Sequence, residues 1–192
     1  MLHDIYNLLM LPVLCGFCFR YLLTGASFDA FVVVAYAYFI GDLLWVVCSP
    51  SCVKSPGVIA GHHCLTMLYM LYPLAYPQLR HYMAMCLSVE LNTFFLILRR
   101  LWHVPPVSVC FYVTWITIRL IIYPYLIYVF AILYVDRSLE TGSWLNSFAL
   151  IPSFQSALTV LNIKWTVDLA RRKLDMMRDP SLRARMSKAK GL

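Results

Sequence analysis

Charged residues are scarce in this sequence of 192 residues. They make up 13% of the chain, whereas a soluble domain carries about 25%. Apolar residues fill 61% of it, and the mean hydropathy is +0.72. These values exclude an ordinary soluble protein and indicate an integral membrane protein. The length leaves room for one domain of about six spans and little more.

Several other features are absent. The odd count of seven cysteines argues against a full disulfide set. No basic region opens the chain and no small-residue cleavage site follows a short apolar stretch, so we expect the first apolar run to be a span. Five histidines are too few for the boxes of a di-iron hydroxylase or desaturase. The sequence therefore predicts neither a bound metal nor another cofactor.

Apolar runs separated by clusters of Gly, Pro and Ser predict the spans. Because backbone groups in lipid must be satisfied within the chain, we expect these runs to be helices. They cover residues 5–23, 30–49, 58–76, 82–101, 106–134 and 143–166. The fifth run is long and contains Arg119 and Pro124, which predicts a kink near Tyr123 or a tilted helix. The predicted fold is an all-α, polytopic bundle of about six transmembrane helices.

Basic residues predict the topology. The spans place Lys54, Arg99 and Arg100 on the same side as the nine Lys and Arg residues of 164–192, so we expect both termini to be cytosolic. Residues 173–192 then form a basic cytosolic tail against anionic headgroups. Near its end, Lys188 and Lys190 resemble a dilysine retrieval signal. That resemblance predicts residence in the endoplasmic reticulum membrane and binding to coat proteins.

Six polar side chains fall inside four different predicted spans, and helical rise sets their depths. Ionisable groups on separate helices usually converge on each other or on a wet cavity. We therefore expect at least four of these side chains to meet in one layer that faces the cytosol. His62 shares a helix face with Thr66, whereas His63 points about 100° away. The six are Asp42, His62, His63, Glu90, Asn92 and Arg119.

The order of these residues resembles the TLC-domain family. The motifs that carry the resemblance are Tyr36-x-Tyr38-x3-Asp42-Leu43-Leu44-Trp45, His62-His63-x2-Thr66, Glu90-x-Asn92-Thr93-Phe94-Phe95-x3-Arg99, Thr117-x-Arg119, Tyr123-Pro124-Tyr125 and Leu161-Asn162-x2-Trp165. It covers roughly residues 20–172 and implies a TLC-type helical bundle there, with residues 1–19 as the N-terminal part of the first span.

The family divides, and one motif separates its branches. Ceramide synthases carry a His-Asp pair followed three residues later by another Asp on the span after the paired histidines. An alignment without gaps places Ser88, Val89 and Asn92 at those positions. The chain is therefore more similar to the TLC-domain-containing group implicated in membrane lipid composition.

Three functions remain open on this evidence. The first is lipid homeostasis through a lipid-binding chamber that includes Asn92, Arg119, Thr66 and Tyr38. The second is an acyltransferase that uses acyl-CoA as co-substrate, with a histidine base at His62 or His63 oriented by Asp42 or Glu90. The third is an endoplasmic reticulum cargo receptor. A zinc hydrolase is least favoured because adjacent histidines diverge on a helix. Membrane lipids are the predicted partners, and no nucleic acid is expected.

Overall fold

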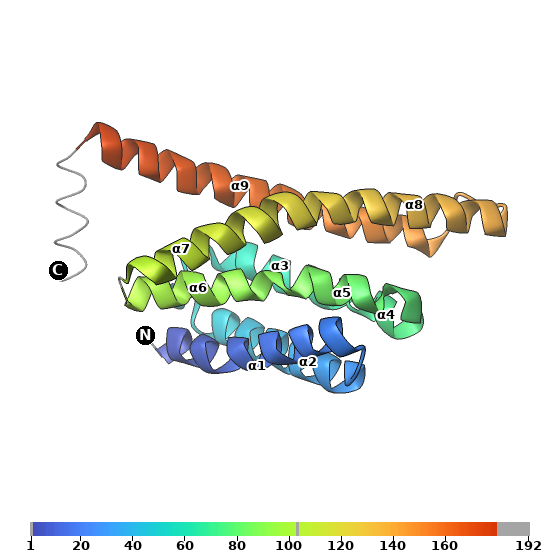
Figure 1. Ribbon diagram of the computed structural model, residues 1–192, viewed down its shortest axis with the longest axis horizontal. Coiled ribbons are helices and arrows are strands. Elements are labelled where there is room, and N and C mark those ends of the chain that lie inside the picture. The colour runs from blue at the N-terminus through green and yellow to red at the C-terminus, as the bar shows by residue number, and fades with distance from the viewer. Residues whose placement is uncertain (1, 103, 180–192) are drawn as a thin grey trace.

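The computed structural model describes residues 2–102 and 104–179, apart from the side chain of Met176. Every regular element in these ranges is helical, which confirms the predicted all-α class. The elements form six helical rods that run along one long axis (Figure 1). The α-helices are α1 (Leu2–Thr24), α2 (Phe28–Cys48), α3 (Pro56–Tyr69), α4 (Leu71–Ala75), α5 (Arg80–Leu87), α6 (Val89–Leu101), α7 (Pro105–Thr114), α8 (Tyr123–Thr141) and α9 (Leu150–Arg178).

Proline residues begin helices and glycine residues follow their ends, at the positions that the sequence predicts. Pro56 and Pro105 open α3 and α7, where the missing N–H costs nothing. Gly25 and Gly142 follow α1 and α8 with φ of 68° and 66°, a left-handed conformation that glycine adopts without strain. The breaks between the predicted spans are therefore confirmed at these positions.

Five stretches are long and apolar enough to cross a membrane. They are Leu2–Thr24, Phe28–Cys48, Pro56–Ala75, Pro77–Leu101 and Pro105–Thr141, and they agree with the first five predicted runs. Together they make the chain a polytopic membrane protein.

The sixth run differs from the prediction. Its helix α9 begins at Leu150 rather than 143, and it does not qualify as a span by composition. Gln155 and Asn162 lower its hydropathy, yet both are buried because α9 packs against α8, α3 and the segment before α8. Residues 173–178, predicted to belong to the tail, continue α9. Lys188 and Lys190 lie outside the described residues.

The fifth run is one continuous helical path with an irregular centre. Residues Trp115–Ile122 form a π-helical segment, η3, between α7 and α8, and the path changes direction there (Figure 1). Pro124 follows directly. Its ring excludes a regular bond to the carbonyl of residue 120, and a wider turn relieves that conflict. The predicted kink is confirmed, and η3 also places Arg119 in the interior.

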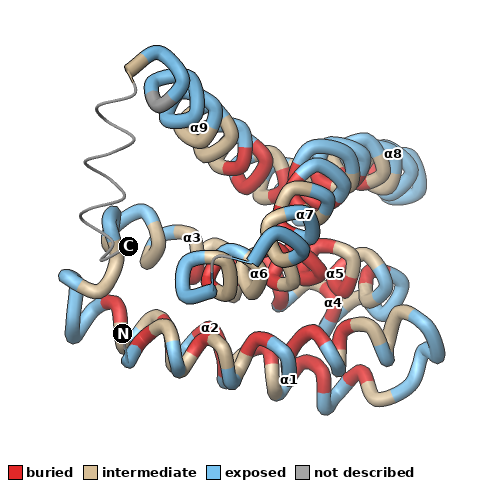
Figure 2. Tube along the Cα trace, turned by 60° about the vertical axis from the view of Figure 1, so that its left-hand side comes forward, coloured by how far each residue is buried: buried red, intermediate tan, exposed pale blue. Residues whose placement is uncertain are grey.

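Burial follows the inner faces of the rods (Figure 2). One apolar cluster joins α1, α2 and α5 and includes Leu11, Phe31 and Met83. A second joins α3, α5, α8 and α9 around Leu126 and Ile151. Large apolar side chains also remain exposed along the outer faces, and in a membrane these contact lipid.

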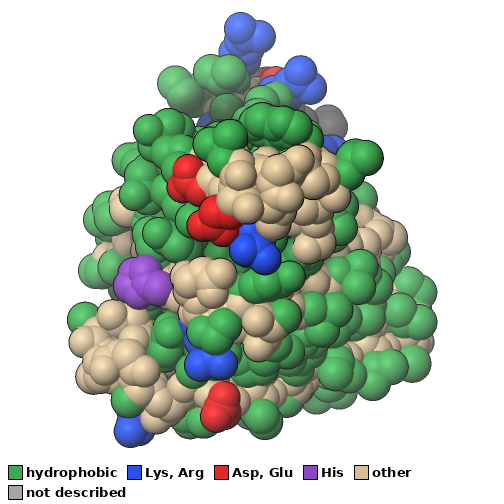
Figure 3. Space-filling model, turned by 90° about the vertical axis from the view of Figure 1, so that its right-hand side faces the viewer, with side chains coloured by type: hydrophobic (Ala, Val, Ile, Leu, Met, Phe, Trp, Pro, Cys, Tyr) green, Lys and Arg blue, Asp and Glu red, His purple; other side chains and the backbone are tan. Residues whose placement is uncertain are grey.

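The two ends of the bundle differ in charge. The end that carries α4 and the α8–α9 turn shows mostly hydrophobic side chains, uncharged polar side chains and backbone, with a few charged side chains (Figure 3). The opposite end holds the start of α1 and the end of α9 (Figure 1), and α9 brings Arg171, Arg172 and Lys173 there. The ends of the described chain therefore lie on one side of the bundle.

Candidate functional site

The carboxylate of Asp42 joins three helices. One oxygen of Asp42 accepts from His63 Nε2 at 2.6 Å, and the other lies 2.7 Å from His3 Nε2 and 3.0 Å from Asn7 Nδ2. All four side chains are buried. We call these residues the Asp42 cluster; it ties α2 to α1 and to α3.

Aromatic rings hold this cluster in place. Tyr38, one turn before Asp42, makes a T-shaped contact with His63, with centroids 6.5 Å apart, and stacks on Tyr6. Gly41 allows this packing, because a Cβ at Gly41 would lie 2.2 Å from the hydroxyl oxygen of Tyr6. Tyr38 therefore supports His63 and lies 2% exposed.

Orientation separates the two adjacent histidines. His63 turns toward Asp42, whereas the ring of His62 lies 5.8 Å from that of Trp165 on α9. The Nδ1 atom of each imidazole is buried and has no partner among the described residues. Because His63 Nε2 donates to Asp42, its Nδ1 keeps a free lone pair.

A groove runs between α3 and α9 beside His62. Its volume is about 290 Å³. The lining residues are Gly61, His62, Leu65, Ala157, Leu158, Val160, Leu161 and Lys164; we call it the α3–α9 groove. Lys164 at its rim is exposed and pairs with Asp168 at 3.1 Å. Hydrogen bonding from Lys164 lowers the pKa of the Asp168 carboxyl.

Arg119 lies at the centre of a second polar cluster. Its Nε donates to Asn92 Oδ1 at 2.8 Å, one terminal nitrogen donates to Asn162 Oδ1, and the other reaches Thr93 Oγ1 at 3.3 Å. The guanidinium carbon lies 5.0 and 5.4 Å from the ring centroids of Trp115 and Trp165. We call Arg119, Asn92, Thr93 and Asn162 the Arg119 cluster.

Glu90 connects the two clusters. It is 4% exposed, bonds with the Thr93 hydroxyl, and interacts electrostatically with both His63 and Arg119. Asn92 is fixed on its other side by Phe111 O and Thr114 Oγ1, each 3.0 Å from its Nδ2. The structure thus brings Asp42, both histidines, Glu90, Asn92 and Arg119 into one polar interior.

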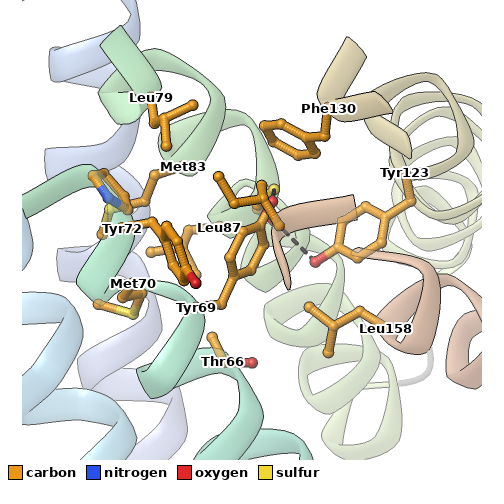
Figure 4. Close-up of a pocket in the computed structure, with 13 residues that line it drawn as sticks. Thr66, Tyr69, Met70, Tyr72, Leu79, Met83, Leu87, Tyr123, Phe130 and Leu158 are labelled. Carbon is orange, nitrogen blue, oxygen red and sulfur yellow. Dashed lines mark hydrogen bonds between the residues drawn. The ribbon is translucent and has the colours of Figure 1, made fainter. Parts of the chain in front are cut away.

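Thr66 lies in a different space. It lines a narrow crevice that also contains Tyr69, Leu158 and Tyr123, whose hydroxyl donates to Cys86 O (Figure 4). The crevice volume is about 20 Å³, and a water needs about 10–15 Å³. The crevice has room for about one water and none for a lipid chain. Leu158 lines both the crevice and the α3–α9 groove.

The sequence prediction missed four members of these clusters. His3 and Asn7 were not selected because they stand at the start of the first apolar run, where polar residues are common. Their spacing of four residues places both on one face of α1, and Asn7 Nδ2 lies 3.2 Å from His3 Nε2. Thr93 and Asn162 appeared in motifs but received no role. Among the described residues, no group of three or more His, Cys, Asp or Glu is arranged to hold a metal ion.

The sequence of the chain matches the model of one protein family. The family model described as the TLC domain, which groups TRAM, LAG1 and CLN8 proteins, matches residues 15–171. The match includes every residue of the Arg119 cluster and both Asp42 and His63. A search of curated proteins and a search of solved structures give no match.

Proposed function

Because the chain belongs to the TLC-domain family, we propose that this multi-pass membrane protein acts in membrane lipid homeostasis by binding a lipid in the α3–α9 groove. The observation that carries the proposal is the groove itself, which places His62 beside apolar side chains of α3 and α9. Ligand sites are commonly apolar with a few convergent polar groups.

The groove has the character of a lipid site. Leu65, Leu158 and Leu161 supply apolar walls, and Lys164 supplies a cation at the rim. A bilayer lipid offers the matching chemistry, with apolar chains beside an anionic phosphate. The lack of side chains at Gly61 leaves the wall open, because nothing lies within 4 Å of the Cβ position there.

Filling the groove tests the proposal. Gly61→Leu places a side chain in the open wall without a clash at its Cβ, and we expect retained phospholipid, measured by native mass spectrometry of the purified protein, to fall about tenfold, which corresponds to ~1.4 kcal/mol. Gly57→Leu is the matched control, since Gly57 is one turn earlier on α3, has equally open space and lies outside the groove. Equal lipid retention by both variants would reject the groove as the site.

A second candidate is acyl transfer, which the 2.6 Å contact between His63 and Asp42 favours. The carboxylate would fix the imidazole tautomer, so that His63 Nδ1 accepts the proton of an amine or hydroxyl. The deprotonated nitrogen or oxygen then bonds to the acyl carbonyl carbon, the carbon–sulfur bond of the acyl-CoA breaks, and the proton leaves with the thiolate.

Turnover of acyl-CoA distinguishes this candidate from simple binding. The acyl-transfer mechanism predicts that His63→Gln lowers the release of free coenzyme A by at least ~100-fold, the usual contribution of a general base, while lipid retention in the groove persists. If wild-type protein releases no coenzyme A with any lipid acceptor, the candidate is wrong and the binding proposal stands.

Location and orientation complete the proposal. We infer that the end holding Arg171, Arg172 and Lys173 faces the cytosol, in accordance with the positive-inside rule. Residence in the endoplasmic reticulum membrane rests on the lysines at 188 and 190, as the sequence predicts.

A further inference from the structure

The amide nitrogen of Asn162 is a buried donor without a partner. The side chain is 2% exposed, and its Nδ2 has no hydrogen-bond partner among the described residues. The assignment of nitrogen and oxygen follows from Arg119, which can only donate and therefore faces Oδ1. A buried donor without an acceptor raises the free energy of the folded protein, so an acceptor from a ligand would stabilise this nitrogen.

Arg119 offers further donors beside Asn162. A guanidinium carries five N–H groups, and the described residues accept three hydrogen bonds from it. The rings of Trp115 and Trp165 flank the group, and the three side chains that accept from it among the described residues are Asn92, Asn162 and Thr93. Two elements, η3 and α9, thus present N–H groups beyond those that the described residues accept.

These donors adjoin the lipid groove. Leu161 and Lys164, one residue before and two residues after Asn162 on α9, line the α3–α9 groove, and at these spacings their side chains leave the helix on other faces than Asn162 does. Trp165 contacts both Arg119 and His62, and His62 is a wall residue of the groove. The ring of Trp165 therefore lies between His62 at the groove wall and Arg119, and a ligand group must pass it to reach the donors.

We infer that Asn162 and Arg119 form a donor pair that binds an acyl carbonyl oxygen of the lipid in the groove. The inference rests on the proposed function and names the part of the lipid that this interior recognises. A carbonyl and a phosphate both offer acceptor oxygens. The carbonyl fits better because Asn162 and Arg119 are 2% and 6% exposed, whereas the exposed Lys164 at the rim suits the hydrated phosphate.

The test compares lipids that differ only at the carbonyl. Diacyl phosphatidylcholine and its dialkyl ether analogue share headgroup and chains, and only the first has the acceptor oxygen. We expect wild-type protein in nanodiscs of the ether lipid to bind added diacyl lipid about tenfold more tightly than a labelled ether lipid. In Asn162→Asp this preference disappears, because the carboxylate still accepts from Arg119 but no longer donates.

Controls separate this inference from the proposed function. Thr159→Val, one turn before Asn162 on α9 and bonded only to Gln155 O among the described residues, keeps the preference. If the wild-type protein binds the ester and ether lipids equally, the inference about Asn162 and Arg119 is wrong, and the proposed lipid site in the α3–α9 groove is unaffected. If the wild-type protein binds neither of the two lipids, the proposed function is wrong. Phosphatidic acid and diacylglycerol are compared in the wild type and in Asn162→Asp. If the variant loses a preference for phosphatidic acid that the wild type has, the donors bind the phosphate and the carbonyl is rejected.

Discussion

Replacing Asp42 with alanine is expected to lower the free energy of unfolding by about 3–5 kcal/mol, because buried donors that lose their acceptor each cost about 1–3 kcal/mol. The variant leaves His3 Nε2, His63 Nε2 and Asn7 Nδ2 without their common acceptor. For a chain of this size that loss corresponds to a fall in melting temperature of about 10 °C. Thermal unfolding in detergent, followed by circular dichroism, measures it.

Asp4→Ala is the matched control for this variant. Asp4 is also a carboxylate at the same end of the bundle, but it pairs with Arg100 at 3.6 Å, and the Arg100 side chain is 53% exposed. Such a pair contributes about 1 kcal/mol or less. If the two variants melt within a few degrees of each other, the Asp42 cluster does not stabilise the contact between α1, α2 and α3.

The second large effect is expected for Arg119→Met. Removal of the guanidinium leaves the side-chain oxygens of Asn92 and Asn162 without a donor and deprives Glu90 of its electrostatic interaction with Arg119. We expect a loss of about 3–5 kcal/mol, again measured by thermal unfolding. Arg20→Met serves as the control because Arg20 lies exposed on α1.

A double variant identifies the counter-charge of Arg119. If Glu90 has that role, Glu90→Gln added to Arg119→Met recovers stability, and the two changes together cost about 1–3 kcal/mol less than their sum. Strict additivity would show instead that the amides alone stabilise the buried cation. A result of this kind would also weaken the link between the Arg119 cluster and His63, which Glu90 supplies.

The sequence predicted the spans well because proline and glycine act locally. Pro56 and Pro105 open helices through their own ring geometry, so no tertiary contact is needed to place them. The late start of α9 was not predicted, because a 3-10 turn at Ser147–Ala149, in which the Asn146 side chain accepts from Phe148 N, precedes it. The burial of Gln155 and Asn162 was not predicted either, because contacts with other helices compensate both side chains. Composition alone cannot distinguish such residues from residues that face water.

Depth along each helix predicted part of the polar interior. It brought Asp42 near the histidines and Arg119 near Asn92, because helical rise converts sequence position into depth. It could not supply rotation, which decides that His63 meets Asp42 while His62 meets Trp165. Nor could it identify His3, whose burial depends on the packing of α1 against α2.

The most direct test of the lipid site is photocrosslinking in the membrane. A phosphatidylcholine with a photoreactive acyl chain is incorporated into vesicles with the wild-type protein, and the labelled peptides are identified by mass spectrometry. We expect adducts to concentrate on Gly61–Leu65 of α3 and Ala157–Leu161 of α9, the two walls of the groove. We also expect these adducts to be lost in Gly61→Leu. Adducts spread evenly over the lipid-facing helices, and unchanged in that variant, would contradict the proposed lipid site.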